Sequence, residues 1–104
     1  MRTWHDWRGV AIRVTEERRA HISEHPEMVG QETRIEETLA QPDTVMQSRS
    51  DPGVHLYYRL YESTPVGRKH LCAVVRLWGD DAFLVTAFFT DRPKRGTLLW
   101  TAAG

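Results

Sequence analysis

Apolar and polar residues alternate with a period of two through the second half of this chain. The segments 54–61, 69–78 and 82–91 are rich in β-branched and aromatic residues, which predicts three strands. Gly79 and Asp80 separate the last two segments and are typical of a tight hairpin turn. Both faces of these two segments are largely apolar, so we expect central strands covered on one side and partly on the other.

A helical pattern occupies residues 15–40 instead. Thr15 is a good N-cap, and Glu16 and Glu17 follow it in the first turn, where carboxylates suit the helix dipole. Pro26 disfavours helical geometry in the residue before it, so the first helix should end near residue 25. Proline also suits the first position of a helix, which predicts a second helix from Pro26 to about residue 40.

Helices followed by a meander of strands predict an α+β fold, with the N-terminal helices packed on one face of a four-stranded antiparallel sheet. The segment 44–50 would supply the fourth, weaker strand, and 9–14 is an edge strand or a lead-in. A length of 104 residues fits one domain, residues 1–104, with a single core. The residues expected in that core are Ile35, Leu71, Val75, Val85 and either Phe83 or Phe88.

Charge is balanced overall, because Lys and Arg total 14 and Asp and Glu also total 14. Acids dominate residues 16–43 and bases lead from residue 59 onward, including a basic loop at 92–96. This predicts an acidic helical layer beside a more basic sheet, or simply two solvated faces of opposite sign. No apolar run approaches the roughly 20 residues of a membrane span, and no signal peptide is evident. We therefore expect a cytoplasmic protein without a membrane partner.

Few side chains suggest a metal or nucleophile site. Cys72 is the only cysteine, so an intrachain disulfide is excluded, and its apolar strand predicts a small buried hydrophobe. His21 and His25 are four residues apart, a spacing that can hold a metal. No third ligand stands out and Pro26 interrupts the helix there, so we expect no metal and no other cofactor. A solvated or capping pair of histidines is the alternative.

One face of the segment 54–61 combines polar and aromatic side chains. Arginine in such a strip suits a phosphate, because its guanidinium binds oxyanions in a bidentate way. Tyrosine can stack on a base. An ordinary solvent-exposed face is the alternative. The members of this strip are His55, Tyr57, Arg59 and Tyr61, and the neighbouring segments add Arg68, Lys69, Thr86 and Thr90.

Three stretches of the chain resemble the phage-associated branch of the barnase–EndoU–colicin–RelE-like (BECR) nucleases. They are HISEHPEM, YYRLYESTPVGRKHLCAVVRL and FLVTAFFTDRPKRGTLLW, and together they cover about residues 21–100. The resemblance implies helices on a four-stranded antiparallel sheet, in agreement with the prediction above. It also implies metal-independent RNA cleavage by attack of the ribose 2′-hydroxyl on the adjacent phosphate, in a toxin or a phage effector.

The resemblance implies roles for named residues. His21 would act as acid or base with His25 as its partner, because histidine transfers protons near neutral pH. Arg59 and Lys69 would bind the phosphate as its charge grows. The substrate-binding residues would be Tyr57, Tyr61, Arg68, Thr86 and Thr90. RNA is then the expected substrate, and an inhibitor or phage protein the expected partner. Two alternatives stay open: a non-catalytic module that binds RNA or protein, and a structural phage protein with a degenerate nuclease fold.

Overall fold

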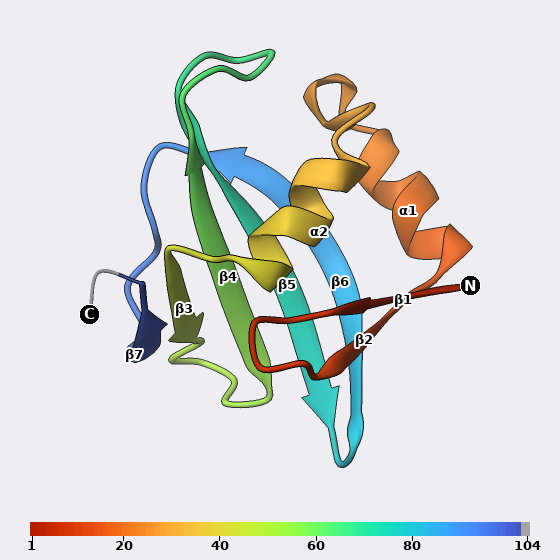
Figure 1. The fold of residues 1–104 in the computed structure, drawn as a ribbon, viewed down its shortest axis with the longest axis vertical. Coiled ribbons are helices and arrows are strands. Elements are labelled where there is room, and N and C mark those ends of the chain that lie inside the picture. The colour runs from red at the N-terminus through yellow and green to blue at the C-terminus, as the bar shows by residue number, and fades with distance from the viewer. Residues whose placement is uncertain (103–104) are drawn as a thin grey trace.

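The computed structural model describes residues 1–102 and contains one sheet of seven strands (Figure 1). Residues 103 and 104, which complete the predicted domain, lie outside this range. In space the strands follow the order β1-β2-β6-β5-β4-β3-β7. Along the chain the elements are β1 (Arg2–His5), β2 (Ala11–Val14), α1 (Glu16–Ser23), the 3-10 helix η1 (Pro26–Met28), α2 (Glu32–Ala40), β3 (Thr44–Gln47), β4 (Val54–Tyr61), β5 (Lys69–Trp78), β6 (Asp81–Thr90) and β7 (Thr97–Thr101).

The meander predicted from the alternating pattern is confirmed. β3 pairs with β4, β4 with β5, and β5 with β6, all in antiparallel register. Gly79 has φ 60°, a left-handed conformation that glycine adopts without steric cost, and it lies in the tight turn between β5 and β6.

The expected four-stranded antiparallel sheet is wrong. β2 extends the sheet beyond β6 in parallel orientation, β1 pairs with β2, and β7 pairs with β3 at the other edge, which gives seven strands in a mixed sheet. The added strands have only four or five residues each, so alternation within them is weak. Their positions also depend on pairings between segments far apart in the chain, which local patterns do not encode.

The helices begin and end for local reasons, and one predicted boundary is wrong. Thr15 Oγ1 accepts a hydrogen bond from the backbone N–H of Arg18 at 3.2 Å, which confirms the predicted cap of α1. Pro26 begins only the short η1, and α2 starts later, at Glu32. Gly30 lies between them with φ 79°, and this left-handed residue separates the two helical segments.

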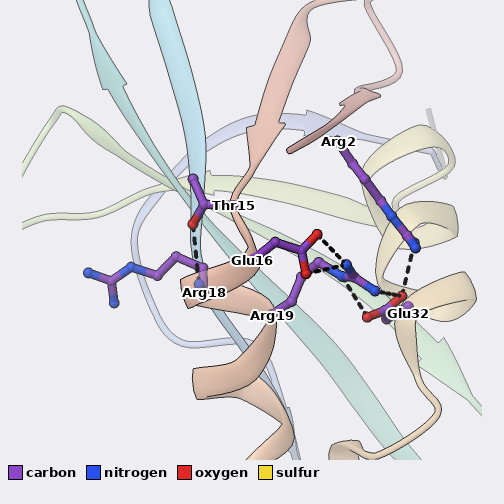
Figure 2. A network of polar contacts seen from close by, with 6 residues as sticks. All are labelled: Arg2, Thr15, Glu16, Arg18, Arg19 and Glu32. Carbon is purple, nitrogen blue, oxygen red and sulfur yellow. Dashed lines mark hydrogen bonds and ion pairs between the residues drawn. The ribbon is translucent and has the colours of Figure 1, made fainter.

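A network of charged side chains joins the first strand to both helices, as Figure 2 shows. Arg19 of α1 donates to Glu32 of α2 at 2.8 Å and to Glu16 at 2.7 Å. Arg2 of β1 donates to Glu32 at 3.1 Å. The pKa of Glu32 lies below its usual range, mainly because of the hydrogen bond from Arg19. Arg18 extends away from this network.

Both helices and the turn between β1 and β2 lie on one side of the sheet, here called the helix face. Ile35 and Leu39 of α2 pack there with Leu71 and Val75 of β5 in the main core cluster. Ile35, Leu71 and Val75 are therefore buried, as predicted. Figure 1 shows α2 and the β1–β2 turn crossing over the central strands. No helix in the described range is long and apolar enough to span a membrane.

The part of the core prediction that concerns β6 is wrong. Phe83 and Val85 are only half-buried, and Phe88 is 41% exposed. The cause is a β-bulge, because Leu84 and Thr86 pair with consecutive residues of β5 and leave Val85 as an extra residue. The bulge inverts the alternation, so Leu84 joins the core cluster on the helix face. Thr86 and Phe88 lie on the opposite side, here called the open face.

Candidate functional site

The polar strip predicted on β4 is covered by other elements. Tyr57 is 1% exposed, and its hydroxyl donates to Asp6 in the β1–β2 turn at 2.9 Å. Burial, together with the Asp6 carboxylate, raises the pKa of Tyr57 well above its usual value. Arg59 donates to the carbonyl of Gln41 at 2.6 Å, and Tyr61 donates to Glu37 at 2.6 Å. These contacts attach β4 to the N-terminal turn and to α2.

The two histidines of the resembling motif lie elsewhere. His21 is exposed on α1 with Nδ1 3.7 Å from Glu24, and His25 is exposed just before η1. Within the described residues, no hydrogen bond or ion pair joins either histidine to Arg59 or Lys69. α1 packs mainly on β6, whereas Arg59 meets the end of α2. The described residues contain no group of three or more His, Cys, Asp or Glu side chains that could hold a metal ion.

The remaining predicted residues divide between two places. Lys69 forms an ion pair with Asp91, and Arg68 pairs with Glu62 at 2.9 Å, so carboxylates already balance both cations. Thr86 and Thr90 lie on the open face, opposite in register to Val74 and His70 of β5. They are therefore separated by the sheet from the strip that holds Tyr57 and Arg59. The structure does not gather the predicted residues into one site.

A groove of about 790 Å³ lies on the open face instead. Its apolar lining comes from Leu56, Tyr58, Val74 and Phe88. Leu56 and Tyr58 are buried, whereas Phe88 is 41% exposed. The groove thus offers an accessible aromatic ring within an otherwise packed, apolar surface.

Four cations surround this groove. Arg49 lies in the β3–β4 loop, and Arg92, Lys94 and Arg95 lie in the β6–β7 loop. All four are exposed, and none forms an ion pair within the described residues. No acidic residue lines the groove. Uncompensated charge of one sign makes it attractive to anions.

The β6–β7 loop is held against the sheet by two local features. The backbone N–H of Lys94 donates to the hydroxyl of Tyr58 at 3.0 Å. A Cβ at Gly96 would lie 2.6 Å from the carbonyl oxygen of Gln47, so glycine allows the chain to approach β3 closely. These contacts fix the path along which the loop cations reach the groove.

No reactive thiol lies beneath the groove. Cys72 is fully buried, and burial raises the pKa of its thiol to about 12. Burial likewise raises the pKa of the adjacent Tyr58 to about 12. Both groups therefore stay protonated near neutral pH, and Cys72 is the buried hydrophobe that its strand predicts.

His70 lies on the open face, next to Thr90 in the sheet. It is opposite Thr90, which lines the groove, and its Nδ1 lies 3.2 Å from the carbonyl oxygen of Asp91. A carbonyl oxygen only accepts hydrogen bonds, so Nδ1 carries the proton. In the neutral ring Nε2 is then the unprotonated nitrogen that can accept a proton.

Sequence reasoning identified the basic loop at 92–96 but gave it no role, named Phe88 only as a candidate for the core, and missed Arg49 and His70. The spacing of two residues between His70, Cys72 and Val74 could have indicated the position of His70, because such residues of a strand lie on one face. Comparisons with protein-family models, curated proteins and solved structures find no match for this chain.

Proposed function

We propose that this protein binds single-stranded RNA in the open-face groove. The observation that carries the proposal is an apolar floor with an exposed Phe88, surrounded by four cations that form no ion pair in the described residues: Arg49, Arg92, Lys94 and Arg95. Arginine and lysine bind the phosphates of a nucleic acid, and aromatic rings stack on its bases. The groove combines both kinds of contact.

The apolar floor favours a single strand over a duplex. In a duplex the bases are stacked inside and the charged backbone faces the protein, so Leu56, Val74 and Phe88 would meet phosphates. A single strand can turn its bases toward Phe88 while its phosphates stay at the cationic rim. The resemblance to ribonucleases favours RNA over DNA.

A competition between strands tests this proposal. We expect the protein to bind a fluorescein-labelled RNA of roughly 12 nucleotides at least about tenfold more tightly than the same RNA in a duplex, because stacking on an aromatic ring contributes about 1–3 kcal/mol per base. Fluorescence anisotropy at fixed ionic strength measures both affinities. Equal affinities for the two forms would show that the floor of the groove does not receive bases.

RNA cleavage is a second candidate function, and the position of His70 favours it. The 2′-oxygen of a bound ribose would attack its own 3′-phosphate and pass its proton to Nε2 of His70. The new bond joins this oxygen to phosphorus, and the bond from phosphorus to the 5′-oxygen breaks. The departing 5′-oxygen takes a proton from water, His70 returns its proton to the solvent, and the loop cations stabilise the charge on the phosphate.

Two histidine variants separate His70 from the motif-based candidate. If cleavage occurs in the groove, RNA should be cut in the presence of EDTA and leave a 2′,3′-cyclic phosphate. His70→Ala should lower turnover by roughly 10²–10⁴-fold, the usual effect of losing a proton-transfer group, and His21→Ala should leave it unchanged. His21 is exposed, and His70 is half-buried with one hydrogen bond, so circular dichroism should show folded variants and a loss of no more than about 1 kcal/mol for His70→Ala. The opposite pattern would support the assignment of His21, and no cleavage by any variant would leave binding as the only function.

A further inference from the structure

β7 forms one edge of the sheet and pairs on one side only. Its single neighbour in the strand order is β3, and no strand in the described range lies beyond it. An edge strand presents backbone N–H and C=O groups that can pair with a further strand. The outer side of β7 from Thr97 to Trp100 is therefore available for sheet extension.

The two edges of the sheet differ in how well they are protected against such pairing. The other edge strand, β1, has the sequence RTWH, and its Arg2 reaches to Glu32 of α2. β7 has the sequence TLLWT, with no charge and no proline. Leu98 is 54% exposed and Leu99 is 42% exposed. β7 thus lacks the charges and prolines that protect edges, and it exposes apolar side chains instead.

An irregularity in β7 leaves Leu99 outside the pairing with β3. Leu98 and Trp100 pair with consecutive residues of β3, so Leu99 is an extra residue of the bulge. The strand still runs without interruption from Thr97 to Thr101. The bulge therefore bends the edge without ending it.

We propose that β7 accepts an extended acidic segment of a partner protein as an additional antiparallel strand. Lys94 and Arg95 lie just before β7 and have no carboxylate partner in the described residues. In antiparallel pairing, the end of the incoming segment reaches this loop, where acidic residues would balance both cations. A second copy fits less well, because the end of its own β7 is followed by uncharged Ala102.

A designed peptide tests this docking site independently of RNA. The probe is a fluorescein-labelled peptide of about nine residues, with alternating valine and threonine followed by two aspartates. We expect it to bind at least about tenfold more tightly than the same peptide ending in two lysines. N-methylation of alternate backbone nitrogens should abolish binding, because it removes the hydrogen bonds of an added strand. Fluorescence anisotropy measures all three affinities.

Variants of the protein locate the peptide. Leu99→Lys and Arg95→Glu should each weaken binding at least about tenfold, whereas Val66→Lys, at an exposed apolar residue in the β4–β5 connection, should not. Circular dichroism checks that each variant is folded. If Leu99→Lys does not fold, Arg95→Glu still tests the proposal. Binding that survives both β7-side variants, or equal binding of the N-methylated peptide, would overturn the proposal. A wild-type dimer that Leu99→Lys dissociates would replace the partner with a second copy.

Discussion

Replacing Arg92 and Arg95 together with alanine is expected to weaken the binding of single-stranded RNA on the order of 100-fold at an ionic strength of about 0.1 M, where charges more than about 10 Å apart are largely screened. Both side chains line the open-face groove, and neither forms an ion pair in the described residues. A hydrogen bond to a charged group contributes about 1.5–3 kcal/mol, so losing two costs at least about 3 kcal/mol, or roughly 100-fold in affinity. Fluorescence anisotropy with a labelled RNA measures the change.

A matched double variant controls for overall charge. Arg2→Ala combined with Arg18→Ala also removes two positive charges, but from β1 and α1. Neither residue lines the groove. In Figure 2 Arg2 points to Glu32 and Arg18 extends away from the network. Because salt screens distant charges, this variant should lose no more than about threefold in affinity. Equal losses in both double variants would mean that the affinity for RNA depends on the net charge of the protein rather than on this groove.

Asp6→Ala should lower the free energy of unfolding by about 2–4 kcal/mol, because the buried carboxylate accepts several hydrogen bonds and a hydrogen bond to a charged group contributes about 1.5–3 kcal/mol. Asp6 is 4% exposed and accepts hydrogen bonds from the Tyr57 hydroxyl, the Arg8 guanidinium and the backbone N–H groups of Arg8 and Val10. Alanine would leave the buried Tyr57 hydroxyl without this acceptor and would release the β1–β2 turn. Urea denaturation followed by circular dichroism measures the loss.

Two further variants provide reference values for the loss of stability expected of Asp6→Ala. Tyr57→Phe removes one of the hydrogen bonds and should cost about 1 kcal/mol. Asp80→Ala changes an exposed carboxylate in the β5–β6 turn and should stay within about 0.5 kcal/mol of wild type. A stability of Asp6→Ala close to that of Asp80→Ala would contradict the role given to the buried carboxylate.

The sequence was most informative where local chemistry decides the structure. Period-two alternation predicted the strands from residue 54 to 90, and the hydroxyl of Thr15 predicted the start of α1. The faces of β6 were not predictable in this way, because a single extra residue at Val85 inverts the alternation. Nothing in the local sequence distinguishes a bulge at Val85 from a regular strand.

The candidate site was harder to predict because it depends on which side of the sheet is covered. Alternation on β4 separates Tyr57 from Tyr58 but does not tell which of them lies under the helices. The polar strip with Tyr57 has side chains that suit a phosphate and a base, yet the β1–β2 turn and α2 cover it. Likewise, only the folded chain pairs Lys69 with Asp91 and brings Arg49 to the same groove as Arg92.

The salt dependence of RNA binding tests the central claim most directly. For single strands, the logarithm of the affinity falls against the logarithm of salt concentration with a slope of about −0.7 per neutralised phosphate. Four groove cations therefore predict a slope of about −2.8 for wild type and about −1.4 for the variant without Arg92 and Arg95. The control without Arg2 and Arg18 should keep the wild-type slope. Identical slopes for wild type and the groove variant would contradict the claim that RNA lies in the open-face groove.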